Sequence, residues 1–397
     1  MKKNILFVIP SLGAGGAEKS LVNLLNQIDY DKFNVDLFMF SHGGIFSEFL
    51  PKEVNILELP NDYISFSLPF RHSLITMIRN KQFSLLVNKL KFTLINNIKK
   101  DSANVEQYNW KYLSRCFEKI DKNYDAAIGY LEKTSIYFCV DKVVAKKKIG
   151  FIHTDYDKSG MDSKRDIKYF DKLDNIITIS EECLNVLEKR FPTQNHKMSV
   201  MYNIISPTMI DNMSKVGDKN LFKKKDDEVI ILSIGRLIYL KGFDMAIKAC
   251  KKLIDANYNI KWYVIGEGEE RENLSNLIKE NNLDDRFILL GLKSNPYPYI
   301  KQADIYVQSS RYEGKSIALD EAKIMHKPIV ITNYSTAKDQ IDNNINGLIV
   351  NMDEESIGEG IKKLIEDKML VEKMKEELRK IDLGTELEID KLYNLII

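Results

Sequence analysis

Residues 5–25 read ILFVIPSLGAGGAEKSLVNLL, and this stretch indicates how the chain folds. The run at 5–9 is continuously apolar, which is typical of a strand covered on both faces of a sheet. A glycine-rich turn follows, and the next apolar residues recur at helical spacing. A further strand is expected at 35–40. Strand, glycine-rich turn, helix and strand in this order predict a crossover unit of a parallel sheet.

The same alternation continues along the chain. Further strands are expected at 126–130, 148–152, 175–179, 229–234, 261–265, 286–290, 304–308 and 328–332, with helices such as 243–256, 269–281 and 316–326 between the later ones. Strands that alternate with helices predict an α/β protein, and 397 residues are too many for one ordinary core. We therefore expect two doubly wound domains, at 1–203 and 204–382, with a tail at about 383–397 that packs back on the first domain.

The composition is that of a globular protein of balanced charge. Hydrophobic residues make up 44% of the chain and charged residues 29%, and the formal net charge of +1 argues against a nucleic-acid partner. The four cysteines lack the spacing of a zinc site or a disulfide framework, which favours a reducing compartment. The apolar run at 5–9 is too short for a signal peptide, and no stretch approaches the ~20 apolar residues of a membrane span. We expect a cytoplasmic protein.

Residues 63–100 differ in composition from the rest. The segment contains no Asp or Glu, and Leu, Ile and Phe are interleaved with basic residues, as in FSLLVNKLKFTLINNIKK at 83–100. A basic amphipathic segment of this kind can lie on the surface of an anionic bilayer. The alternative is a solvated helix face. The basic residues of the segment are Arg71, Arg79, Lys81, Lys89, Lys91, Lys99 and Lys100.

Two cations follow the strand expected at 229–234. The sequence GRLIYLKGF at 235–243 places Arg236 and Lys241 between two glycines. The planar fork of an arginine and the compact charge of a lysine both suit phosphate oxygens. Because ligands of doubly wound domains bind at the carboxyl ends of strands, these side chains are candidates for an anion site. Taken alone, the pair could equally be two surface cations.

A pair of carboxylates follows a later strand. In QSSRYEGKSIALDEA at 308–322, Glu313 lies in the loop before an expected helix and Glu321 lies on that helix. The free N–H groups around Lys315, Ser316 and Ile317, at the start of the helix, would form an anion site. Glu321 could accept hydrogen bonds from two hydroxyl groups of a ribose. Glu313 could do the same for a second polyol. The sequence therefore predicts a site for a nucleotide sugar.

Four stretches in this order resemble the retaining glycosyltransferases of family 4 (glycosyl transferases group 1), of the bacterial surface-polysaccharide type. They are IPSLGAGGAEKSLVNLL (9–25), SIGRLIYLKGFDMAIKA (233–249), YVIGEGEERENLSNLI (263–278) and SRYEGKSIALDEAKIMHKPIVITN (310–333). They resemble, in turn, the first glycine-rich loop, the phosphate-binding strand end, the following strand and turn, and the Glu-x7-Glu motif of that family. The resemblance covers nearly the whole chain and implies the GT-B fold, with two Rossmann-like domains facing a central cleft.

The resemblance also implies roles for single residues. Arg236 and Lys241 would hold the donor diphosphate, Glu321 the ribose and Glu313 the donor sugar. His153 follows a strand and matches a histidine near the donor sugar, although a lone histidine is more often structural. These roles make His153, Arg236, Lys241 and Glu313 the catalytic candidates. The donor-binding candidates add Gly15, Gly16, Gly314, Lys315, Ser316, Ile317 and Glu321.

The reaction implied is transfer of a hexose or N-acetylhexosamine from a nucleotide sugar, with UDP favoured, to an acceptor hydroxyl with retention of configuration. A lipid-linked or surface-polysaccharide acceptor is the hypothesis that segment 63–100 suggests.

Asp-x-Asp stretches at 29–31 and 155–157 are short enough to arise by chance, so we expect no cofactor and no metal ion. Lys315 stands where many members have an aromatic or apolar residue, and it would contact phosphate or face solvent.

Two other functions remain open at this point. A nucleotide-sugar epimerase would use the same fold, and a catalytically idle protein could stabilise an active glycosyltransferase. The presence of Arg236, Lys241, Glu313 and Glu321 argues against the idle protein. A phosphorylase is weakened because no setting for pyridoxal phosphate is visible. A dehydrogenase is excluded by the spacing of the glycines at 13–16, which is not G-x-G-x-x-G.

Overall fold

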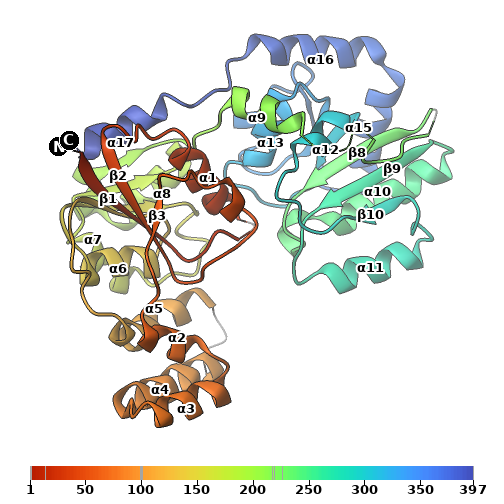
Figure 1. Ribbon diagram of the computed structural model, residues 1–397. Coiled ribbons are helices and arrows are strands. Elements are labelled where there is room, and N and C mark those ends of the chain that lie inside the picture. The colour runs from red at the N-terminus through yellow and green to blue at the C-terminus, as the bar shows by residue number, and fades with distance from the viewer. Residues whose placement is uncertain are drawn as a thin grey trace. The chain divides into compact units, whose positions relative to one another are not determined.

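The computed structural model describes residues 2–13, 15–98, 102–216, 218, 220–225 and 227–396. The chain divides into two compact units (Figure 1), which are called unit 1 and unit 2. Unit 1 consists of Met1–Ile204 and Glu386–Ile397, and unit 2 of Ile205–Thr385. The first division lies one residue after the boundary expected from the sequence. Where the chain leaves and re-enters unit 1, Ile205 and Thr385 are joined by two hydrogen bonds of 2.8 and 3.0 Å.

Unit 1 is built on a parallel sheet of order β3-β2-β1-β4-β5-β6-β7. Its strands are β1 (Lys3–Ile9), β2 (Phe33–Met39), β3 (Asn55–Ile56), β4 (Asn123–Gly129), β5 (Val144–Ile152), β6 (Asn175–Thr178) and β7 (Met198–Val200). Its helices are α1 (Gly16–Leu25), α2 (Asn61–Ser67), α3 (Phe70–Arg79), α4 (Phe83–Ile98), α5 (Ser102–Leu113), α6 (Thr134–Lys142), α7 (Ser163–Phe170), α8 (Glu181–Arg190) and α17 (Glu388–Ile396).

Both faces of the unit 1 sheet are covered, as the continuous apolar run of β1 predicts. On one face, Ile5 and Phe7 pack with residues of α1 and α17, and on the other, Leu6 and Val8 pack with residues of α6. The C-terminal helix α17 lies beside β1 and β2 (Figure 1). It is fixed there by Tyr393, whose hydroxyl accepts a hydrogen bond of 2.8 Å from the N–H of Asp29.

Unit 2 has a second parallel sheet, of order β10-β9-β8-β11-β12-β13. Its strands are β8 (Val229–Ile234), β9 (Ile260–Ile265), β10 (Phe287–Leu289), β11 (Ile305–Gln308), β12 (Ile329–Thr332) and β13 (Leu348–Val350). Its helices are α9 (Pro207–Ser214), α10 (Phe243–Asp255), α11 (Arg271–Glu280), α12 (Tyr297–Gln302), α13 (Ile317–Ile324), α14 (Ala337–Gln340), α15 (Glu354–Glu366) and α16 (Lys368–Lys380).

The two sheets share one topological feature that positions candidate residues. In each sheet the chain runs outward from a central strand and then returns to its other side, so β1 pairs with β4 and β8 pairs with β11. Ligands of open α/β sheets bind beyond the carboxyl ends of the strands at such a switch point. The glycine-rich turn follows β1, the two cations follow β8, and the loop with Glu313 follows β11.

The segment at 63–100 is where the structure differs most from the sequence analysis. It contains the end of α2 and the separate helices α3 and α4, which pack against each other. Lys89 was predicted to lie on a basic face, and this is wrong: the residue is buried, and its ammonium donates to the carbonyls of Phe66 and Leu68 at 2.6 and 3.1 Å. Lys99 and Lys100 lie outside the described residues. None of the helices in the described part of the chain combines the length and the apolar character that a membrane span needs.

Candidate functional site

The carboxyl end of β8 carries the two cations expected to hold phosphate. The strand is buried at 230–232, and from Gly235 the chain turns into the 3-10 helix η4 (Tyr239–Lys241). Arg236 is exposed, and the side chain of Lys241 keeps 21% of its surface exposed. The turn therefore presents a guanidinium and an ammonium group at one edge of the sheet.

An ion pair ties this turn to the loop that follows β11. Arg311 donates to both carboxylate oxygens of Asp244 at 2.7 Å, and it donates to the carbonyl of Tyr239 at 2.9 Å. Burial by itself raises the pKa of Asp244, but the hydrogen bonds and the charge of Arg311 outweigh it and hold this pKa below its usual value. Arg311 therefore fixes the loop at 309–316 against the first turn of α10 through Asp244, and against the turn at 235–242 through the carbonyl of Tyr239.

Lys241 and Glu313 are brought together by this arrangement. The ammonium of Lys241 forms an ion pair with the carboxylate of Glu313, whose side chain is 11% exposed. Ser310 Oγ donates to the same carboxylate at 2.7 Å, and Thr336 Oγ1 donates to the backbone carbonyl of Glu313 at 3.0 Å and to that of Gly314 at 2.7 Å. A phosphate that binds Lys241 must therefore bind beside Glu313 or displace its carboxylate.

The start of α13 is only in part the anion site that the sequence predicts. Ser316 is the N-cap, and its Oγ accepts a hydrogen bond of 3.3 Å from the N–H of Leu319. The N–H of Ser316 donates to Gln340 Oε1 at 3.0 Å, so the prediction that this group is free is wrong. The side chain of Gln340 comes from α14, and sequence spacing gave no sign that it would reach the helix start. An anion bound here would take the place of Gln340.

Glu321 lies on α13, but it lies below the surface. Only 1% of the residue is exposed, and Tyr297 of α12 donates to its Oε1 at 3.0 Å. Burial and the nearby charge of Glu321 raise the pKa of Tyr297 well above its usual value, so the tyrosine remains a hydrogen-bond donor. A ribose hydroxyl can reach this carboxylate only after the side chains that cover it shift.

Lys315 points to a partner that the sequence analysis did not consider. Its ammonium lies 4.0 Å from the carboxylate of Asp320, and its side chain is 29% exposed. Asp320 is buried, and burial raises its pKa. Lys315 thus helps to compensate a buried acid on α13, which is neither of the two roles expected for it.

In unit 1, the glycine-rich turn leads directly into α1. Gly15 is the N-cap, with extended backbone angles (φ −115°, ψ 160°), and Gly16 is the first helical residue. The helix is fixed to the sheet by Ser20, whose hydroxyl lies 2.9 Å from that of Tyr130 and donates to Asn203 Oδ1 at 2.7 Å. The two glycines stand at the β1–β4 switch point, and their proposed approach to a ligand stays a prediction.

His153 follows β5 and rests against two aromatic rings. The ring centroids of Tyr130 and Phe151 lie 5.0 and 6.0 Å from that of the imidazole. Burial lowers the pKa of His153 to about 4, against the opposing effect of a hydrogen bond with the backbone of Tyr130. The imidazole is therefore neutral at pH 7. Among the described residues its Nε2 atom is buried without a hydrogen-bond partner, and a polar group of a ligand would satisfy it.

Glu132 is a site residue that the sequence analysis missed. It follows β4, is 7% exposed, and accepts hydrogen bonds from the backbone N–H of His153 at 3.2 Å and from Thr154 Oγ1 at 3.1 Å. Burial raises its pKa, although those hydrogen bonds oppose the shift. Its role is to hold the segment that carries His153. The signal available in the sequence was an acidic residue three positions after the end of an apolar strand.

The Asp-x-Asp stretches are occupied by local contacts. Asp155 accepts the N–H groups of Asp157 and Lys158, and Asp157 pairs with Arg190 at 2.6 Å. The stretch at 29–31 includes an ion pair of 2.9 Å between Asp29 and Lys32. In the part of the chain that the structure describes, no group of three or more His, Cys, Asp or Glu residues could hold a metal ion. Independence of metal stays a prediction.

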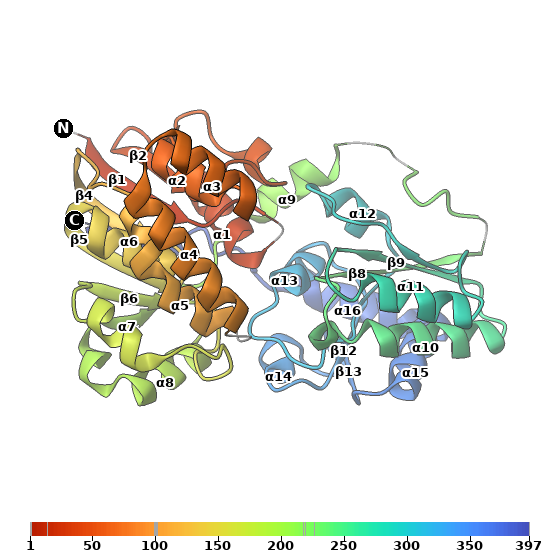
Figure 2. The same ribbon diagram turned by 90° about the horizontal axis from the view of Figure 1, so that it is seen from below.

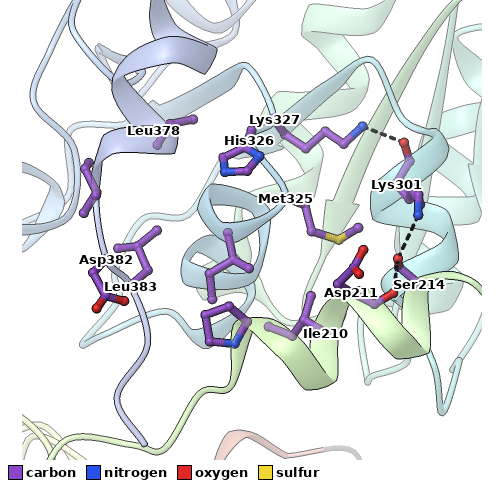
Figure 3. Close-up of a pocket in the computed structure, with 13 residues that line it drawn as sticks. Ile210, Asp211, Ser214, Lys301, Met325, His326, Lys327, Leu378, Asp382 and Leu383 are labelled. Carbon is purple, nitrogen blue, oxygen red and sulfur yellow. Dashed lines mark hydrogen bonds between the residues drawn. The ribbon is translucent and has the colours of Figure 1, made fainter.

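A cavity of about 460 Å³ lies elsewhere in unit 2, at the C-terminal end of α13 (Figure 3). Lys327 lines it and donates to the carbonyls of Lys301 and Ala303 at 2.6 and 2.8 Å, and burial lowers its pKa to about 8. Because Ser316 begins the opposite end of this helix, the cavity is separate from the loop at 309–316. No residue predicted to bind the donor lines it.

Comparison with known protein families concerns the part of the chain that carries the candidate residues of unit 2. Residues 218–381, which include every candidate of unit 2, match the family model "Glycosyl transferases group 1". These residues are similar to the glycosyl transferases group 1 family. The predicted resemblance to glycosyl transferases group 1 is confirmed over residues 218–381, a smaller region than the sequence suggested, while retention of configuration and family 4 stay predictions.

Known proteins are similar to this chain over different lengths. An uncharacterized glycosyltransferase of Methanocaldococcus jannaschii is 29% identical over 195 residues, 46% of this chain and about half (47%) of that protein. The N-acetylgalactosamine-N,N'-diacetylbacillosaminyl-diphospho-undecaprenol 4-alpha-N-acetylgalactosaminyltransferase of Campylobacter jejuni is 27% identical over 375 residues, 93% of this chain and 92% of the enzyme.

A solved structure shows the fold of the whole chain. HepE of Anabaena, crystallised in complex with UDP-glucose, superimposes with a TM-score of 0.70 at 14% sequence identity, covering 99% of this chain and 98% of HepE. With its two parallel sheets and flanking helices, the chain has the GT-B fold, and this prediction is confirmed.

The turn after η4 yields a first prediction, about stability. Gly242 has φ +64°, and a Cβ atom there would lie 2.1 Å from the carbonyl oxygen of Ser309. We expect Gly242→Ala to lower the free energy of unfolding by about 3 kcal/mol, since it combines backbone strain with a clash against a fixed carbonyl. Gly314→Ala is the control, because a Cβ there meets no atom within 4 Å. Urea unfolding of both variants checks this, and equal stabilities would contradict it.

His153 yields a second prediction, about pH. A histidine in the unfolded chain binds a proton below pH about 6.5, whereas folded His153 binds one only below about 4. The unfolded state therefore binds more protons in this window, and stability falls as the pH decreases through it. Between pH 6.5 and 4, wild type should lose on the order of 2 kcal/mol more than His153→Gln.

The matched control for this experiment is His196→Gln, which alters an exposed histidine of unit 1. Both variants keep Glu132, whose pKa burial also raises, so its contribution cancels from the comparison. Denaturant unfolding at four pH values supplies the data. If His153→Gln and His196→Gln show the same pH dependence as wild type, the imidazole is not held neutral by burial.

Proposed function

We propose that the protein is a retaining glycosyltransferase of family 4 that moves a hexose or N-acetylhexosamine from a UDP-sugar to an acceptor hydroxyl. The observation that carries the proposal is the meeting of Lys241 with Glu313 beside Arg236, at the switch point of a unit that is similar to the group 1 family. A cation for phosphate and a carboxylate for hydroxyl groups, in contact with each other, fit the junction between a diphosphate and a sugar.

The donor diphosphate is assigned to Arg236 and Lys241. When the bond between sugar and phosphate breaks, negative charge develops on the leaving diphosphate and positive charge on the sugar. Two cations at this position stabilise the first of these charges electrostatically. Arg236 is exposed and Lys241 is partly exposed, so both can reach a bound ligand. These charges are the reason to propose a reaction that needs no metal ion.

The sugar and the ribose are assigned to the two carboxylates. Glu313 is fixed by Lys241 and Ser310, so its oxygens hold one position as acceptors for sugar hydroxyls. Glu321 accepts the ribose hydroxyls once its cover of side chains has shifted. His153 of unit 1 stays a candidate for the donor sugar, since its Nε2 has no hydrogen-bond partner among the described residues, and Glu132 holds the backbone of the segment that carries it. In a retaining reaction by front-face attack, the leaving phosphate takes the proton of the acceptor hydroxyl.

The acceptor is proposed to be a saccharide linked to a lipid or to a surface polysaccharide. The support is the relative from Campylobacter jejuni, whose name gives a diphospho-undecaprenol-linked saccharide as its acceptor and which matches 93% of this chain. The proposed place of action is the cytoplasmic face of the membrane. The four cysteines are buried free thiols, which fits a reducing compartment.

Isothermal titration with UDP and with GDP, without metal, tests the donor site. Wild type should bind UDP more tightly than GDP, and Arg236→Ala should weaken UDP binding by about 10- to 100-fold, the effect of losing charge-assisted hydrogen bonds. Arg379→Ala is the control, because it removes an exposed arginine of the same unit at the end of α16. The proposed donor site would be contradicted if wild type bound neither nucleotide. Equal UDP affinities in wild type, Arg236→Ala and Arg379→Ala would also contradict it.

A further inference from the structure

The outer face of α4 carries a stripe of exposed apolar side chains. Its members recur at i, i+4, i+7, i+11 and i+15, which places them on one side of the helix. They are Phe83, Val87, Leu90, Leu94 and Ile98, with 63%, 47%, 44%, 59% and 69% of their surfaces exposed. The opposite face of α4 is already used, since Leu85, Asn88 and Lys89 are buried. The stripe therefore does not belong to the core of unit 1.

The neighbouring helix α3 repeats this pattern. Ile75 and Ile78 are 51% and 55% exposed, and the exposed Arg71 and Arg79 share their side of the helix at i, i+4, i+7 and i+8. The two helices pack side by side, as both views show (Figure 1 and Figure 2). We call the exposed face of these two helices the α3–α4 surface.

The charges of this surface have one sign. Arg71, Arg79, Lys81 and Lys91 are exposed, and residues 63–100 contain no Asp or Glu. Lys89 does not contribute, because its ammonium is buried and bound to two carbonyls at the end of α2. An apolar stripe accompanied only by cations is suited to an apolar phase with an anionic boundary.

We propose that the α3–α4 surface docks on an anionic lipid bilayer, with the α4 stripe entering the interface and the four cations contacting lipid headgroups. A second copy of this chain is disfavoured as the occupant, since the same face would oppose four cations with four more. The arrangement goes beyond the proposed function and does not depend on it. It would hold the enzyme at the surface in which a lipid-linked acceptor resides.

Flotation of the full chain with lipid vesicles tests the proposal. Wild type should bind vesicles of phosphatidylcholine with about one third phosphatidylglycerol at least tenfold more tightly than vesicles of phosphatidylcholine alone. Removing three cations, in Arg71→Gln/Arg79→Gln/Lys91→Gln, should weaken binding by about 100-fold, because each cation near an anionic surface is worth about fivefold. Leu90→Ser/Leu94→Ser should weaken binding to both kinds of vesicle, by at least tenfold for the anionic ones.

Matched controls alter equally exposed residues elsewhere. Met369 and Leu387 are 86% and 82% exposed, so Met369→Ser/Leu387→Ser should bind as wild type does. Three exposed lysines outside the surface serve for charge, in Lys172→Gln/Lys189→Gln/Lys248→Gln. Because every altered side chain is exposed, thermal unfolding should show unchanged stability in all variants.

Two results would overturn the proposal. The first is a failed flotation test: either the wild-type protein does not float with anionic vesicles, or the variants of the α3–α4 surface float as well as their control variants. The other is a wild-type dimer in sedimentation velocity that Leu90→Ser/Leu94→Ser converts to a monomer, since a second copy would then cover the stripe. No nucleotide is present in either experiment, so both outcomes leave the proposed donor site to be judged by UDP titration alone.

Discussion

The ion pair between Arg311 and Asp244 is the contact on which the arrangement of the proposed donor site depends. It joins the loop that follows β11 to the first turn of α10, and it does so with two hydrogen bonds of 2.7 Å. Arg311 is engaged a second time by the carbonyl of Tyr239, so the guanidinium has little freedom. Because both partners are partly exposed, the pair itself contributes on the order of 1 kcal/mol to stability. Its larger effect is geometric, because it brings Lys241 within reach of Glu313.

Both units place their candidate residues by the same topological rule. In unit 1 the turn after β1 and the segments after β4 and β5 carry Gly15, Glu132 and His153. In unit 2 the segments after β8 and β11 carry Arg236, Lys241 and Glu313. Parallel strands end at the same edge of a sheet, so residues far apart in sequence meet there without any local signal in the sequence. Glu132 and Arg311 illustrate this, since neither touches the proposed ligand and each fixes a residue that would.

The elements were largely predictable because they depend on local patterns. The strand β8 runs over the residues predicted for it, since a continuous apolar run there ends at a glycine. Contacts between loops were not predictable in the same way. Lys241 and Glu313 are 72 residues apart, and their contact depends on an ion pair that no spacing rule suggests. The burial of Glu321 depends likewise on Tyr297, which comes from another helix.

The errors of the sequence analysis have a common physical cause. The pattern of α4 shows which face is apolar, but it does not show which lysine will cap a neighbouring helix, so Lys89 was assigned to the surface. The N–H groups at the start of α13 were taken as free because the sequence gives no register between α13 and Gln340. In both cases a buried polar group found a partner from a distant part of the chain, as buried polar groups generally do.

The central claim is that Lys241 holds the diphosphate of a nucleotide, and the ratio of UDP to UMP affinity tests it most directly. UMP lacks the second phosphate but keeps the base and the ribose, so the ratio isolates the phosphate contact. In wild type we expect UDP to bind at least tenfold more tightly than UMP, and Lys241→Met should reduce this preference about tenfold while UMP affinity stays the same. An unchanged preference for UDP in Lys241→Met would contradict the account.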